Sequence, residues 1–150
     1  MNTLKRNTAV AATLGALLMG GALAQTPAPL PPVQQSGSVQ YLSGGIGLDE
    51  STAIEKASRQ WPLTLEFAIR DEQHADFAAD VNVLVRDASG HATLQTTSEG
   101  PFLLARLLPG RYSVEATLAG KTLHENVVIR KGQPARAVFV WPAEAGMASS

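Results

Sequence analysis

The hydrophobic pattern of this 150-residue chain changes period at Pro62, and this change most constrains its fold. From Leu63 to Trp141, apolar residues recur at every second position within short runs, as in strands with one buried face. Turn signals such as Asp87–Gly90 separate these runs roughly every ten residues. The seven runs are 63–70, 81–86, 91–97, 102–107, 112–118, 123–129 and 135–141. They predict a mainly β fold, a single antiparallel seven-stranded β-sandwich.

Ahead of the sandwich, residues 49–60 (DESTAIEKASRQ) predict one short α-helix. A narrow stripe recurs at helical spacing and ends on a tryptophan: Ile54, Ala57, Ser58 and Trp61. Asp49 or Ser51 is expected to cap the helix start, and Pro62 to stop the helix. The helix is therefore expected to pack one face against a larger element.

The chain begins with the features of a cleavable signal peptide. Lys5 and Arg6 precede an apolar run over 9–18, and small residues lead up to Ala24. We expect residues 1–24 to be removed by cleavage after Ala24, so that the protein is periplasmic or secreted and is not held in a membrane.

Two further segments are expected to lie outside the folded domain. Residues 25–38 are rich in Pro, Gln and Ser, which predicts a disordered tether. Residues 143–150 are small and polar, which predicts a flexible tail. The helix and the sandwich are therefore expected to occupy 39–142.

Charge and cysteine content narrow the function. Removing 1–24 takes away two of the 12 basic residues and none of the 13 acidic ones, so the formal charge moves from −1 to −3. This mild acidity, with no basic run, disfavours nucleic acid as a partner. The chain has no cysteine, which excludes thiol nucleophiles and thiolate metal sites.

Residues 103–120, LLARLLPGRYSVEATLAG, place a Leu-Pro-Gly corner ahead of Arg-Tyr and an alternating strand. This stretch resembles the carboxypeptidase regulatory-like domains, which are small prealbumin-like (transthyretin-like) β-sandwiches. Pro109 and Gly110 would form the corner, and the Tyr112 hydroxyl would bond nearby backbone. Residues 41–141 are also similar to a group of small exported bacterial proteins of unassigned function that carry this domain. The resemblance thus implies a fold and an export route, but no particular activity.

A glycine-rich segment just before the helix invites comparison with a phosphate-binding loop. No lysine stands where the segment meets the helix, and Asp49 and Glu50 there would repel phosphate, so we reject that interpretation. The segment is instead a candidate protein-interaction loop with apolar side chains on a glycine frame: Leu42, Gly44, Gly45, Ile46, Gly47 and Leu48. The alternative, which we favour, is that these apolar residues pack on their own domain.

Candidate metal chemistry gathers in one acidic loop, which holds Asp71, Glu72, His74 and Asp76. One imidazole with carboxylates could hold a divalent cation, but a solvated connection explains the loop better, and we expect no metal or cofactor. Trp61 and Trp141 are expected in the core rather than on a ligand platform.

No catalytic motif is found, and the chain is expected not to be an enzyme. We expect an exported, non-catalytic binding or structural module of the bacterial cell envelope, whose partner is an unidentified envelope protein. A carbohydrate-binding module is the first alternative and would need a row of exposed aromatic residues. A hydrolase is the second, and would need His74, His91 or His124 beside a carboxylate and a serine.

Overall fold

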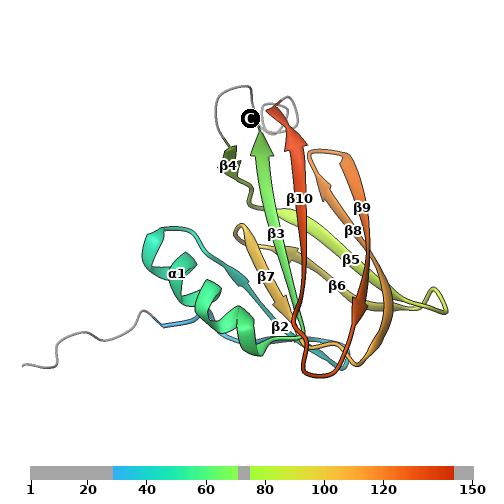
Figure 1. Ribbon diagram of the computed structural model, residues 1–150. Coiled ribbons are helices and arrows are strands. Elements are labelled where there is room, and N and C mark those ends of the chain that lie inside the picture. The colour runs from blue at the N-terminus through green and yellow to red at the C-terminus, as the bar shows by residue number, and fades with distance from the viewer. Residues whose placement is uncertain (1–28, 71–74, 144–150) are drawn as a thin grey trace, which may run out of the picture.

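The computed structural model describes residues 29–70 and 75–143. The predicted signal peptide, residues 71–74 of the acidic loop and residues 144–150 of the tail lie outside this part. Two packed sheets and one helix make up the fold (Figure 1). The elements, in chain order, are β1 (Gln34–Ser36), β2 (Val39–Gly44), α1 (Leu48–Ala57), the 3₁₀ helix η2 (Ser58–Gln60), β3 (Leu63–Arg70), β4 (Ala75–Phe77), β5 (Val81–Asp87), β6 (Ala92–Ser98), β7 (Phe102–Ala105), β8 (Gly110–Leu118), β9 (Lys121–Ile129) and β10 (Ala135–Pro142).

The first sheet has six strands in the order β1-β2-β7-β3-β10, with β4 paired to the end of β3. The second sheet has four strands in the order β6-β5-β8-β9. Each of the seven predicted runs forms a strand, and β1, β2 and β4 are additional. The fold is therefore mainly β and sandwich-like, as the alternating pattern indicated.

The prediction of an all-antiparallel sandwich is wrong in one pair of strands. Strand β10 lies parallel to β3 along its whole length, with Ala135 opposite Leu63 and Pro142 opposite Arg70. The first sheet is therefore mixed. The pairing brings the last strand of the chain beside the first strand of the predicted sandwich, and alternation alone does not specify the direction of such a pair.

Three residues of the predicted tether belong to the first sheet. Residues 34–36 form β1, which pairs antiparallel with β2, and Tyr41 Oη donates a hydrogen bond of 3.2 Å to the Gln34 side chain. Strand β2 in turn pairs with β7. The segment joins the sheet because its backbone groups find partners on β2, despite a composition typical of linkers.

Helix α1 covers part of the outer face of the first sheet. Its stripe is confirmed, since Ile54 is fully buried and Trp61 is 5% exposed. Together with residues of β2 and β7 they form a second, smaller core: Leu42, Ile54, Trp61, Phe102 and Leu104. The capping prediction is wrong, because Gly47 precedes the first helical residue and no side chain caps this end.

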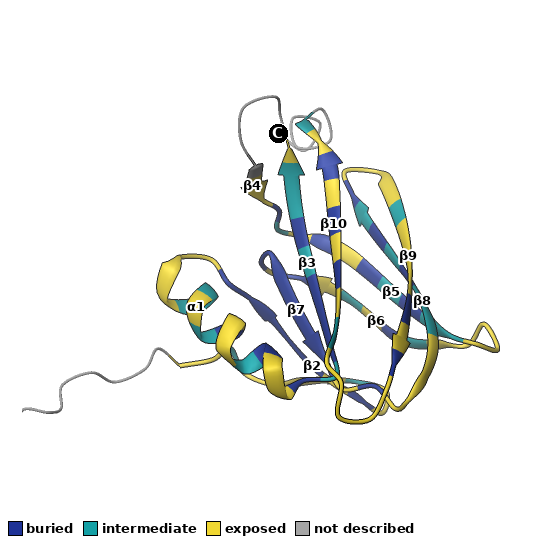
Figure 2. Cartoon of the chain, in the orientation of Figure 1, coloured by how far each residue is buried: buried dark blue, intermediate teal, exposed yellow. Residues whose placement is uncertain are grey.

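The main core lies between the two sheets. Figure 2 shows the buried stretches of β3, β7 and β10 facing those of β5 and β8. Trp141 is fully buried and its indole N–H donates to the Lys121 carbonyl at 3.0 Å, which confirms its core placement. Tyr112 behaves as the corner pattern predicted: its hydroxyl donates to the Leu108 carbonyl at 2.7 Å, and burial raises the pKa of this phenol.

Candidate functional site

The fold divides the predicted interaction loop into a buried part and an exposed part. Leu42 lies on β2 and is fully buried under α1, and Gly44 ends this strand. Ile46 and Leu48, in contrast, are 69% and 80% exposed. The expectation that the apolar residues pack on their own domain therefore holds for Leu42 and is wrong for the other two.

Glu50 fixes the conformation of the exposed loop. Its Oε1 atom accepts a hydrogen bond of 2.7 Å from the backbone N–H of Gly45. Gly45 has a φ of 99°, and a Cβ atom there would overlap the Phe102 ring, so only glycine fits this close approach. Strand β2 precedes the loop, as a strand does in phosphate-binding loops, but a carboxylate of the protein already accepts from the Gly45 N–H that a phosphate would need.

We predict that Glu50→Ala loosens this loop without unfolding the protein. The substitution removes a hydrogen bond to a charged acceptor, at a cost of about 1 kcal/mol in the free energy of unfolding. Amide hydrogen exchange at Gly45 should accelerate, while Glu50→Gln, which retains an acceptor oxygen, should slow the exchange again. Unchanged Gly45 exchange in Glu50→Ala would contradict the role given to this carboxylate.

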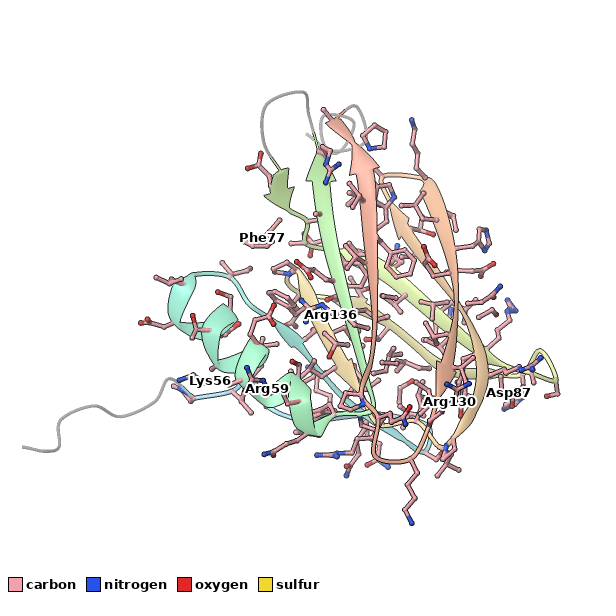
Figure 3. All side chains as sticks on the ribbon, viewed as in Figure 1. Lys56, Arg59, Phe77, Asp87, Arg130 and Arg136 are labelled. Carbon is pink, nitrogen blue, oxygen red and sulfur yellow. The ribbon has the colours of Figure 1, made fainter. Side chains whose placement is uncertain are left out.

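Next to the loop lies an exposed phenylalanine that the sequence did not single out. Phe77 on β4 is 62% exposed, and its ring centroid lies 6.1 Å from that of Phe102. Phe102 also lies against Gly45, so its ring links β4 to the loop. Figure 3 shows Phe77 on the side of β3 that carries α1.

The exposed apolar surface continues across the first sheet. Phe77 is opposite Ala68 on β3, and Ala68 is opposite Val140 on β10, so the three share one face. Val138 lies on this face too, and the two valines are 46% and 38% exposed. We use the name apolar face for this sheet surface together with the two exposed residues of the loop that Phe102 links to β4: Ile46, Leu48, Phe77, Val138 and Val140.

An ion-pair network borders the apolar face where β10 approaches the C-terminal half of α1. Arg136 on β10 lies 2.8 Å from a Glu55 oxygen on α1 and 2.6 Å from a Glu66 oxygen on β3. These contacts raise the pKa of the Arg136 guanidinium above its usual range, and the hydrogen bond to Glu55 contributes most to the increase. The network therefore ties the helix to both parallel strands.

Part of the apolar face is weakly indicated by the amino-acid pattern of the last strand. The run 137–141 (AVFVW) is apolar at every position and is longer than the continuous apolar run 102–105 (FLLA). A strand with apolar side chains on both faces either packs against other elements on both faces or exposes one face that can bind a partner. Phe77, by contrast, lies in a three-residue strand that is too short to show any period.

No metal site is found among the described residues. Within 29–70 and 75–143, no group of three or more His, Asp or Glu side chains is placed to hold a metal ion. Of the proposed ligands Asp71, Glu72, His74 and Asp76, only Asp76 lies in this part, on β4. The metal hypothesis for this loop therefore stays untested.

The two described histidines, His91 and His124, are exposed. His124 lies 3.6 Å from Glu115, with 67% of its side chain exposed. Near His91, the Ser89 hydroxyl donates to Asp87 at 2.6 Å, and this bond lowers the pKa of the Asp87 carboxyl. The serine is thus bonded to a carboxylate instead of an imidazole, which is not the order that activates a nucleophile.

Aromatic side chains do not form an exposed row. Trp61 is 5% exposed and Trp141 is fully buried, so both belong to the core. Phe77 is the only large exposed aromatic among the described residues. A stacking platform for sugars therefore lacks its second ring in this part of the chain.

Neither a membrane-spanning helix nor a match to a family model or a curated protein is found for the described helices and the chain sequence, respectively. No described helix has the length and apolar character needed to cross a membrane. No protein-family model matches this chain, and no curated protein matches it either.

Proposed function

We propose that this protein is an exported, non-catalytic module of the bacterial cell envelope that binds a protein partner through the apolar face. The observation that carries the proposal is the grouping of exposed apolar side chains on one face, with Ile46, Leu48 and Phe77 each more than 60% exposed. Contiguous exposed apolar surface with a polar border is typical of protein–protein contacts. The partner is therefore a protein that presents an apolar surface of its own.

The position of the apolar face supports this assignment. Helix α1 covers only one part of the outer face of the first sheet (Figure 2), and Phe77, Val138 and Val140 lie exposed on strands of the same sheet. Strand β10 is the edge strand of this sheet and carries two of the five residues. An edge strand with exposed apolar side chains offers both backbone and side-chain contacts to a partner.

We also propose that the sandwich is of the carboxypeptidase regulatory-like type. The Leu-Pro-Gly-Arg-Tyr corner supports this, because the bond from Tyr112 to the Leu108 carbonyl gives it the tyrosine geometry of related sandwiches. Carbohydrate binding receives less support, because the described residues contain no second exposed aromatic ring. Hydrolysis receives less support, because the described Ser89 is bonded to a carboxylate and not to a histidine.

Photo-crosslinking in intact cells tests the proposed function. A photoreactive amino acid is placed at Ile46, at Phe77 and, as a control, at the exposed residue Glu125 on the second sheet. We expect one dominant protein adduct, identified by mass spectrometry, from the first two positions and not from Glu125. Self-contacts alone, or the same adducts from all three positions, would refute the proposal.

A further inference from the structure

The end of the sandwich away from the apolar face contains a basic cavity. Its volume is about 470 Å³, within the range of small-molecule sites. Four of the 12 basic residues of the chain line it, from η2, the loop after β7 and the β9–β10 turn: Arg59, Arg106, Arg130 and Lys131. The sequence shows no basic run, because the fold assembles these cations from three separate segments. Figure 3 labels Arg59 and Arg130 on two of them.

The four cations have no counter-charge among the described residues. No Asp or Glu of this part of the chain lines the cavity. Among the described residues, the ion pairs involve Arg136 and His124, and none of the four cavity cations. Gathering like charges in one cavity raises the energy of the empty site, and a bound anion relieves this cost.

The walls of the cavity are apolar and firmly held. Trp61, Leu107 and Ile129 line it and are each at most 6% exposed. The Ala135 N–H donates to the Pro62 carbonyl at 2.9 Å, which joins the β9–β10 turn to the start of β3. A ligand that fills this cavity must therefore offer an apolar body as well as negative charge.

Arg106 joins the cationic part of the cavity lining to its apolar part. Its guanidinium carbon lies 4.1 Å from the centroid of the Trp61 ring. A guanidinium stacked on an indole keeps the N–H groups at its edge available for a planar, two-oxygen acceptor. Carboxylates have this geometry and bind arginine through paired hydrogen bonds.

The backbone around the cavity does not favour a bare phosphate. Phosphate sites use free backbone N–H groups, often at a helix N-terminus. Here the N–H groups of Trp61 and Gln133 donate to Ser58 and Arg130 carbonyls. Three of the lining residues are prolines, which have no N–H: Pro62, Pro109 and Pro134. An anion in this cavity is thus recognised by arginine and lysine side chains.

We infer that this cavity is a binding site for an anion with two or three carboxylates on an apolar body, either a free organic acid or an acidic segment of a protein. The site is separate from the apolar face and does not depend on the proposed protein interaction. A long polyanion fits less well, because the cations are confined to one cavity of a chain whose formal net charge is −1.

The test is an NMR titration of the whole mature chain with benzene-1,3,5-tricarboxylate. The indole N–H signal of Trp61 and the amides of the β9–β10 turn should move, while the Trp141 indole, bonded to Lys121, serves as an internal reference. We expect a Kd of about 0.1–1 mM at low salt for a ligand of this size. Added salt should weaken the binding.

Matched variants show whether the cavity is responsible. Arg130→Gln with Lys131→Gln should weaken binding about tenfold or more. Lys56→Gln with Arg111→Gln removes the same charge outside the cavity and should change the Kd by less than about twofold. All four side chains are exposed, so both double variants should keep the native spectrum.

Two ligand controls complete the test. Citrate lacks the ring and the neutral benzene-1,3,5-trimethanol lacks the carboxylates, so both should bind more weakly than the tricarboxylate. Equal binding of either control, no shift of Trp61 at millimolar ligand, or equal weakening by the two double variants would overturn the inference. The peptide acetyl-Glu-Phe-Glu-amide distinguishes the sources: tighter binding than the tricarboxylate assigns the site to a protein segment, and weaker binding to a free organic acid.

Discussion

Phe67→Ala should lower the free energy of unfolding by about 3–5 kcal/mol, the largest stability effect that we expect from one side chain. Phe67 is fully buried, and its ring centroid lies 5.8 Å from Phe139 and 6.2 Å from Trp141. Both neighbours belong to β10, so the substitution opens a cavity where the parallel pair meets the core. Urea unfolding followed by tryptophan fluorescence measures the loss.

Phe77→Ala is the matched control, because it removes the same side chain from the same sheet at a position that is 62% exposed. It should cost less than about 1 kcal/mol. If Phe67→Ala does not fold at all, Phe67→Leu should still cost about 1–2 kcal/mol in the free energy of unfolding. Equal losses from Phe67→Ala and Phe77→Ala would contradict the assignment of the two rings to core and surface.

The strand alternation that placed Phe67 in the core was readable from the sequence. Leu63, Leu65 and Phe67 are all fully buried, as their spacing in β3 predicted. A period of two identifies the faces of a strand because successive side chains point to opposite sides. Thr64 nevertheless is only 2% exposed, although the pattern placed it on the opposite face.

The sequence could not predict the parallel pairing of β3 with β10 or the strands before the helix. Alternation carries no information on which strand is the neighbour or in which direction it runs. Strand β2 was not predicted as a strand because polar and apolar residues do not alternate along it. Tyr41 faces the main core and Leu42 the second core, so neither face of β2 is polar. The glycine and serine residues at the end of this strand are typical of loops, so the sequence predicted a loop there.

The candidate site could be predicted only in part. Ile46 and Leu48 stood out because two apolar residues on a glycine-rich loop are unusual. Phe77 could not be connected to them, since it joins the loop only through Phe102, and that contact depends on the pairing of β4 with β3. A surface that is assembled from separate strands can be predicted only when the order and direction of those strands in the sheet are known.

Phe77→Ala should also cause the largest functional effect if the apolar face binds a partner. A large aromatic residue at the centre of an interface commonly contributes about 2 kcal/mol or more, which corresponds to about a 30-fold loss of affinity. With the photoreactive residue at Ile46, the yield of the partner adduct in cells should fall to below about a tenth of its original value at limiting partner concentration.

Val128→Ala provides the control for this loss. Val128 lies on β9 of the second sheet and is 46% exposed, so the substitution removes an exposed apolar side chain away from the apolar face. The adduct yield should stay unchanged in this variant. Because Phe77→Ala is expected to leave the protein folded, a loss of adduct in that variant alone reports on the contact itself. A yield that is the same in both variants would remove Phe77 from the interface and, with it, the role of β4 in joining the loop to β10.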